Sequence, residues 1–182
     1  MPTYQPGPPF EMTSYFGEVR EDGTHGGTDY EAPQGTPIPC AVDGVVVGRG
    51  WHDDYGNLVI VKHDDPTTRH DEYTLYAHTL GLCFIPAIGT RVARGQAVGV
   101  VGSTGHSTGP HLHVELMWVV AGMWLTVEEP WEGDTLGLPG SKDYYGRLDT
   151  RVEANWYGMT VYQATEDSDP VAAPSGSCHR YH

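Results

Sequence analysis

The segment of this sequence with the clearest chemical potential is 109–115, Gly-Pro-His-Leu-His-Val-Glu. Successive side chains of a β-strand point to opposite faces, so His111, His113 and Glu115 would share one face. The intervening leucine and valine would fill the other face. Two imidazoles on one strand face can converge on a single point, such as a metal ion. A lone His-x-His also fits a half-buried strand with two exposed histidines, so the metal hypothesis depends on further ligands.

A second candidate cluster is His25-Gly-Gly-Thr-Asp29. The adjacent glycines disfavour a helix and let the backbone bend closely around a ligand. An imidazole and a carboxylate brought together by such a loop suit Zn²⁺. The alternative is a plain turn in which Asp29 caps its own backbone.

Two further histidines follow short runs of residues that either alternate between apolar and polar or are apolar throughout. His78 ends the alternating run 73–78, and a lone histidine in that place is more often structural than catalytic. His63 is followed by Asp64 and Asp65, a grouping that could imitate a metal site but is interpreted as polar residues on an exposed loop.

The elements that must position these residues are predicted to be strands. Glycine-containing turns separate runs of β-branched and aromatic residues at 14–20, 36–41, 44–48, 58–61 and 73–78, which is typical of hairpins. With 24 glycines and 14 prolines, the chain predicts a mostly β fold with loops. We expect an extended N-terminal arm at 1–13, the histidine-bearing domain at 14–125 and an irregular C-terminal extension at 126–182.

Composition excludes several classes of function. The formal net charge of −14 argues against nucleic acid and anionic membranes as partners, because no basic patch could neutralise phosphates. No Cys-x-x-Cys pair is present, so a zinc ribbon is not supported. We find no secretory signal peptide and no run of about 18 apolar residues, and therefore expect synthesis in a cytoplasm and no membrane insertion.

In order and context, these pieces closely resemble the lysostaphin/LytM-type zinc metallopeptidases, which cut the peptide part of bacterial peptidoglycan. The similarity covers roughly residues 14–118. Its matching segments are Phe16-Gly17, His25-Gly-Gly-Thr-Asp29, Ala32-Pro-Gln-Gly-Thr-Pro37, Asp43-Gly-Val-Val46, Tyr55-Gly-Asn-Leu-Val59, Tyr76-Ala-His78, Gly95-Gln96 and 102–115. The resemblance implies a small antiparallel β-sheet or sandwich domain with an open groove.

The resemblance also implies roles for individual residues. His25, Asp29 and His113 would hold one Zn²⁺ per chain, which leaves the fourth tetrahedral position for a water whose pKa the metal lowers. His78 and His111 would lie beside the metal without binding it. We favour His111 as general base, with His78 orienting the water or stabilising the oxyanion, although the two roles could be exchanged.

The expected function is therefore a zinc endopeptidase that hydrolyses cross-links or stem peptides of bacterial peptidoglycan. Family members cut glycyl-glycine or D-alanyl-diaminopimelate bonds, and the sequence leaves this choice open. A substrate outside the membrane and a chain without a signal peptide suggest a bacteriophage protein that acts at the cell wall. It would be either a virion component with phage tail proteins as partners or a lysis enzyme. The alternatives are a phage tail structural or assembly protein, and a non-catalytic wall-binding module.

Overall fold

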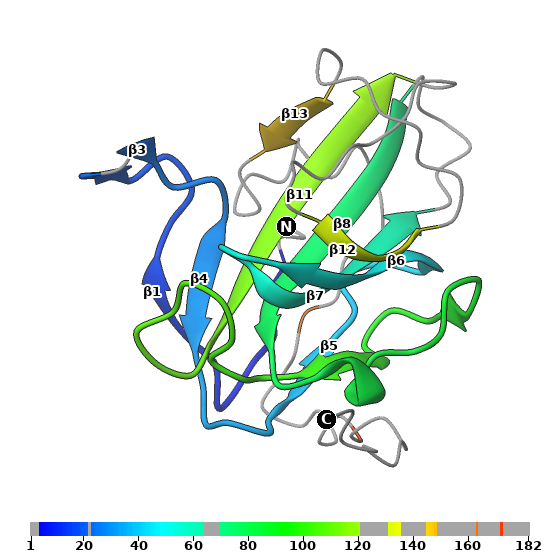
Figure 1. The fold of residues 1–182 in the computed structure, drawn as a ribbon, viewed down its shortest axis with the longest axis horizontal. Helices are drawn as coiled ribbons and strands as arrows, with labels where there is room; N and C mark the ends of the chain where they lie inside the picture. Colours follow the sequence, from blue (N-terminus) through cyan, green and yellow to red (C-terminus); the bar gives the residue numbers. More distant parts are fainter. Residues whose placement is uncertain are drawn as a thin grey trace.

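The computed structural model describes residues 4–21, 23–63, 70–120, 131–135 and 145–148, together with Gln163 and Ala172. These residues form strands and loops with one short 3-10 turn, η1 (Leu82–Phe84). Within the described part of the chain, no helix is long and apolar enough to cross a membrane. The strands, shown in Figure 1, are β1 (Glu11–Ser14), β2 (Val19–Arg20), β3 (Gly23–Thr24), β4 (Thr28–Glu31), β5 (Pro37–Pro39), β6 (Gly44–His52), β7 (Gly56–His63), β8 (His70–Thr79), β9 (Arg91–Val92), β10 (Ala97–Val100), β11 (His111–Val120), β12 (Trp131–Thr135) and β13 (Tyr145–Leu148).

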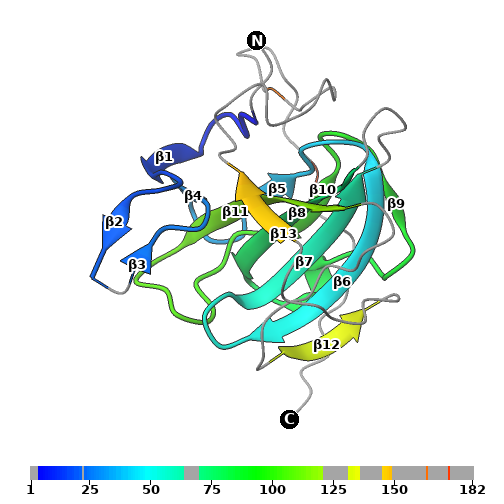
Figure 2. The same ribbon diagram turned by 90° about the horizontal axis from the view of Figure 1, so that it is seen from above.

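One large antiparallel sheet organises the molecule. Its strands follow the order β1-β4-β11-β8-β7-β6-β12, with β13 paired to β11 and β9 paired to β6. Strands β5 and β10 form a second, two-stranded sheet, and β2 and β3 form a hairpin of their own at one side of the molecule (Figure 2). The mostly β, antiparallel fold predicted from the sequence is confirmed.

Strand β11 lies inside this sheet and separates two kinds of environment. Leu112, Val114 and Leu116 belong to the main core, which also contains residues of β5 and β10. On the opposite face, Met117 packs in a second apolar cluster with residues of β7 and β8. The alternation along β11 places His113 on that same second face, so apolar packing on both sides fixes the strand that carries it.

The N-terminal part differs from the prediction of a single strand at 14–20. Strand β1 ends at Ser14, the chain turns at Gly17 with φ +83°, and β2 begins at Val19. Gly17 is in the left-handed region that glycine adopts without a steric penalty, which explains the break. Within the range predicted as an arm, Tyr4 is buried in the main core and β1 pairs with β4. The predicted domain boundaries stay a prediction, and most of 126–182 lies outside the described residues.

Candidate metal centre

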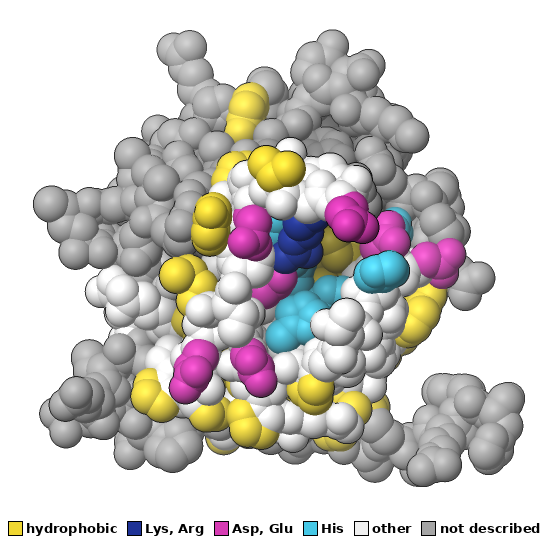
Figure 3. Space-filling model, turned by 90° about the vertical axis from the view of Figure 1, so that its left-hand side faces the viewer, with side chains coloured by type: hydrophobic (Ala, Val, Ile, Leu, Met, Phe, Trp, Pro, Cys, Tyr) yellow, Lys and Arg dark blue, Asp and Glu magenta, His cyan; other side chains and the backbone are white. Residues whose placement is uncertain are grey.

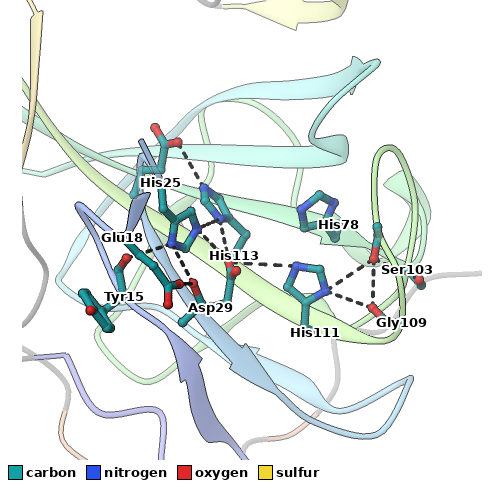
Figure 4. A network of polar contacts seen from close by, with 12 residues as sticks. Tyr15, Glu18, His25, Asp29, His78, Ser103, Gly109, His111 and His113 are labelled. Atoms are coloured by element: carbon teal, nitrogen blue, oxygen red, sulfur yellow. Dashed lines mark hydrogen bonds and ion pairs between the residues drawn. The ribbon is translucent and has the colours of Figure 1, made fainter. Parts of the chain in front are cut away.

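Three polar side chains from separate segments converge where β4 pairs with β11. Asp29 on β4 lies directly opposite His113 on β11, and His25 precedes β4. The Oδ1 atom of Asp29 is 2.7 Å from Nδ1 of His113 and 3.2 Å from Nε2 of His25. The two ring nitrogens are 3.1 Å apart (Figure 4). All three residues are buried and could together hold a metal ion.

The donor set fits zinc. Zn²⁺ binds imidazole nitrogen and carboxylate oxygen at about 2.0–2.2 Å in a tetrahedron, whose ligand atoms would then be about 3.3–3.5 Å apart. The separations of 3.1 and 3.2 Å are close to this range, and the third, 2.7 Å between Asp29 and His113, is a hydrogen-bond distance about 0.6 Å shorter. Three protein donors also leave one tetrahedral position open. The residues that the sequence singled out thus lie together as a metal site requires.

In His25 and His113, the ring nitrogen that faces away from the three donor atoms contacts a further group. Nδ1 of His25 lies 3.0 Å from the Tyr15 carbonyl. Nε2 of His113 lies 3.1 Å from Oε1 of Glu115, and that carboxylate accepts a hydrogen bond of 2.8 Å from the Tyr55 hydroxyl. Such contacts orient a metal-binding imidazole and strengthen it as a ligand. The sequence placed Glu115 on the correct face, and the structure brings it against His113.

A glycine makes the approach of the two strands possible. A Cβ atom added at Gly27 would lie 2.5 Å from the Val114 carbonyl oxygen and 2.7 Å from Nε2 of His113. Those distances are too short for any side chain, so only glycine fits there. The Gly-Gly pair between His25 and Asp29 therefore allows the backbone to pass close to the His113 ring.

Electrostatics in the cluster favour a charged carboxylate at Asp29 beside a protonated imidazole at His113. Burial alone would raise the pKa of Asp29, but hydrogen bonds with His113, His25 and Arg20 hold that pKa well below its usual range. Burial alone would lower the pKa of His113, but its hydrogen bonds to Asp29 and Glu115 outweigh burial and raise the pKa to about 9. A metal ion binding here at neutral pH must therefore displace a proton.

The other two predicted histidines lie beside the three donors. Nε2 of His111 is 3.9 Å from Oδ1 of Asp29, and the rings of His111 and His78 have centroids 4.5 Å apart. Nδ1 of His111 lies 2.9 Å from the Gly109 carbonyl, and Nδ1 of His78 lies 2.8 Å from the Thr104 carbonyl. A carbonyl only accepts, so both rings carry their proton on Nδ1 when neutral and leave Nε2 as an acceptor.

His78 is held in an uncommon conformation. Its φ of +55° lies in the left-handed region, and its backbone N–H donates to the Tyr55 carbonyl at 2.8 Å. Strain of this kind often occurs at functional sites. The side chain is buried, and burial lowers the pKa of His78 to about 4 despite its hydrogen bond to Thr104. His78 is therefore neutral at physiological pH.

A groove opens from the cluster to the surface. A hollow of about 380 Å³ is bordered by Asp29 and His111 together with Thr13, Glu31 and residues 108–110. Figure 3 shows histidine side chains gathered in a hollow of this face, with a basic side chain beside them and acidic side chains around the rim. The open groove expected from the sequence is present, and His111 faces it.

Comparison with known proteins shows which protein family this chain belongs to. Residues 23–124, which hold all five predicted site residues, match peptidase family M23. The chain belongs to this metallopeptidase family. The "DD-carboxypeptidase/endopeptidase Mpg" of Neisseria meningitidis serogroup B is 47% identical over 91 residues, which cover 50% of this chain and 19% of that protein. The "Peptidoglycan DD-endopeptidase ShyA" of Vibrio cholerae is 41% identical over 93 residues, which cover 51% of this chain and 20% of that protein.

A solved structure gives the same result for the fold. A catalytic-domain mutant of the prophage-encoded M23 protein EnpA from Enterococcus faecalis superposes with a TM-score of 0.54 at 37% identity. The match covers 63% of this chain and 85% of that domain. The chain spans only about a fifth of the length of the curated M23 relatives named above.

Several residues around this M23 site were not found from the sequence. Arg20 donates from Nη2 to Oδ2 of Asp29 at 2.8 Å. The Tyr55 hydroxyl donates to the Glu115 carboxylate behind His113, and the Thr104 carbonyl contacts Nδ1 of His78. Tyr55 and Thr104 lie in segments that resemble the family, but nothing in their spacing indicates these contacts. Arg20 lies in a hairpin whose position depends on the turn at Gly17.

Proposed function

We propose that this chain is a zinc-dependent endopeptidase that hydrolyses the peptide part of bacterial peptidoglycan. The observation that carries the proposal is the convergence of His25, Asp29 and His113 at one end of an open groove. Two named relatives are a peptidoglycan DD-endopeptidase and a DD-carboxypeptidase/endopeptidase, which supports the same class of substrate.

His25, Asp29 and His113 would hold the zinc ion. When bound there, zinc would supply Lewis acidity, which lowers the pKa of water toward about 7 and polarises a peptide carbonyl. The protein supplies the orientation of the donors: the Tyr15 carbonyl fixes His25, and Glu115 fixes His113. The buried carboxylate of Asp29 lowers the net charge of the site.

His111 is the best candidate for the general base. It lines the groove, and its proton on Nδ1 leaves Nε2 free to accept a proton from the attacking water. It would then return that proton to the leaving amine. His78 is buried and has a pKa of about 4, which makes it a weak base at neutral pH. Its Nε2 is also an acceptor, so we assign it the orientation of the water in preference to stabilisation of the oxyanion.

Two adjoining hollows form a surface on which an extended peptide could lie. The hollow beside Asp29 and His111 adjoins a second one of about 420 Å³, and both are lined by Glu31 and Pro110. The second hollow continues along Pro9 and Glu11 at the edge formed by β1. A substrate chain lying along this surface would pass the histidine cluster at one end.

The biological setting that we propose is a bacteriophage, in which the enzyme opens the cell wall either as a tail component or at lysis. The EnpA protein that the chain resembles is itself described as prophage-encoded. Mass spectrometry of purified virions would test the tail assignment, and absence of the chain from particles would exclude it. A purely structural role or non-catalytic wall binding would not require five intact site residues.

The direct test of the activity is the release of new amino termini from purified cell walls. Zinc-loaded wild type should cleave walls with direct D-alanyl-diaminopimelate cross-links or walls with glycine bridges, and mass spectrometry of the fragments would identify the bond. The chelator-stripped protein should be inactive and recover when zinc is added. Zinc-loaded protein that cleaves neither kind of wall would contradict the proposal.

A further inference from the structure

Arg20 divides the two oxygens of Asp29 between two tasks. Its Nη2 donates to Oδ2 at 2.8 Å, whereas Oδ1 faces the ring nitrogens of His113 and His25. A carboxylate can bind a metal with one or both oxygens, and its choice depends on what else holds it. With Oδ2 held by the guanidinium, only Oδ1 is directed at the histidines.

The same guanidinium nitrogen also donates to Ser14, whose hydroxyl contacts the second ligand, His25. Nη2 of Arg20 is 2.6 Å from Oγ of Ser14, and that hydroxyl is 3.1 Å from Nδ1 of His25. Ser14 also contacts the carboxylate of Glu18. Arg20 therefore lies between the end of β1 and β4, and connects the groups behind His25 with those behind Asp29.

Arg20 comes from an element that is otherwise separate. The β2–β3 hairpin is not part of the main sheet, and Val19 within it is 85% exposed. Backbone hydrogen bonds anchor its base, where the N–H groups of Gly17 and His25 donate to the carbonyls of His25 and Glu18 at 2.9 Å. The Arg20 side chain is 41% exposed and extends from this hairpin to the largely covered Asp29 carboxylate.

We propose that Arg20 is a positioning residue for the metal site, which restricts Asp29 to one metal-facing oxygen and ties the β2–β3 hairpin to the ligands. The inference rests on the proposed zinc site and assigns it an additional residue. Two opposite effects are expected of a guanidinium here. It orders the carboxylate, which favours zinc, and it places a positive charge near a cation, which disfavours zinc. Of these two effects, the ordering of the carboxylate dominates.

The test is zinc affinity, measured by competition with a chelator of known affinity, for wild type and four variants. Arg20→Ala should weaken zinc binding by about tenfold or more, the effect usual for loss of a group that orients a ligand. Arg20→Lys keeps the charge but lacks the planar fork, and should lie between Arg20→Ala and wild type. Ser14→Ala leaves the Arg20–Asp29 contact and should have a smaller effect than Arg20→Ala.

Arg94→Ala is the matched charge control. Arg94 is exposed in the turn after β9, which lies far from the β2–β3 hairpin in Figure 2. Its removal changes the net charge equally and should leave zinc affinity unchanged. The unfolding temperature of each metal-free variant, followed by circular dichroism, separates a local effect from general destabilisation.

The outcomes distinguish the two proposals. If wild type binds zinc and Arg20→Ala binds it as tightly or more tightly, the role of Arg20 is overturned. The proposed function is then left intact. An equal loss in Ser14→Ala would also overturn it, because the effect would then act through His25. Wild type without zinc affinity would refute the proposed function itself, and the role of Arg20 with it.

Discussion

His63 and the histidines of the metal centre, His25 and His113, are buried in two regions of the molecule, and their surroundings differ. His63, at the end of β7, is 2% exposed, with Nδ1 against the Asp43 carbonyl and Nε2 against the Thr74 hydroxyl. In the metal centre, nitrogens of His25 and His113 contact each other and share one oxygen of Asp29. The first arrangement pairs an imidazole with one carbonyl and one hydroxyl. The second directs several electron-pair donors at one point.

Burial alone does not mark a functional histidine. A neutral imidazole has one donor and one acceptor nitrogen, and a carbonyl and a hydroxyl satisfy both. Two nitrogens and a carboxylate oxygen within about 3 Å of one another form a set that a cation completes. Convergence of ligand atoms is therefore the informative property.

The largest difference between the two regions should appear on removal of one histidine from each. His113→Ala should abolish zinc binding and wall cleavage, because two donors remain of three. His63→Ala should keep one zinc per chain and its activity, but lose about 1–3 kcal/mol of unfolding free energy through a broken buried hydrogen bond. Elemental analysis and urea denaturation measure the two effects. Loss of zinc in His63→Ala with the fold intact would contradict a purely structural role for His63.

A smaller effect should separate the two histidines that lie beside the donors. His111→Ala and His78→Ala should both retain zinc, since neither belongs to the donor set. Loss of a general base typically costs about 10²- to 10⁴-fold in rate, and we expect the larger loss in His111→Ala. Single-turnover cleavage by the zinc-loaded variants measures the two losses. A larger loss in His78→Ala than in His111→Ala would exchange the two roles.

The smallest effect expected for a single step, about tenfold for one pH unit, is the pH dependence of zinc binding. The raised pKa of His113, about 9, means that zinc must displace a proton from that group at any pH below 9. Zinc affinity should therefore rise with pH, by about tenfold per unit for one proton released, and level off above pH 9. Calorimetry in buffers of different ionisation enthalpy measures the proton release. The slope should be the same in His63→Ala, and a flat profile would contradict the raised pKa.

Much of the site could be predicted because its residues sit on regular elements with a fixed period. His111, His113 and Glu115 share a strand face as the alternation requires, and the Gly-Gly pair before Asp29 allows close approach to His113. The interpretation of His63 as a polar residue on an exposed loop was wrong, because its ring is buried against the Asp43 carbonyl and the Thr74 hydroxyl, which lie elsewhere in the chain. Asp64 and Asp65 lie outside the described residues.

The contacts of Arg20 could not be predicted, for a similar reason. Residues 14–20 were expected to form one strand. In an extended strand, Arg20 would lie far from Ser14. The turn at Gly17 reverses the chain and brings Arg20 back to Ser14 and Asp29. Local patterns predict which residues share a face, whereas contacts made through irregular turns depend on three-dimensional packing.

The most direct test of the central claim is a crystal structure of the zinc-loaded protein with anomalous data collected on both sides of the zinc absorption edge. The account predicts one anomalous peak per chain, bound by Nε2 of His25, Oδ1 of Asp29 and Nδ1 of His113, with no protein ligand from His78 or His111. Absence of the peak, or a peak held by a different set of residues, would contradict it.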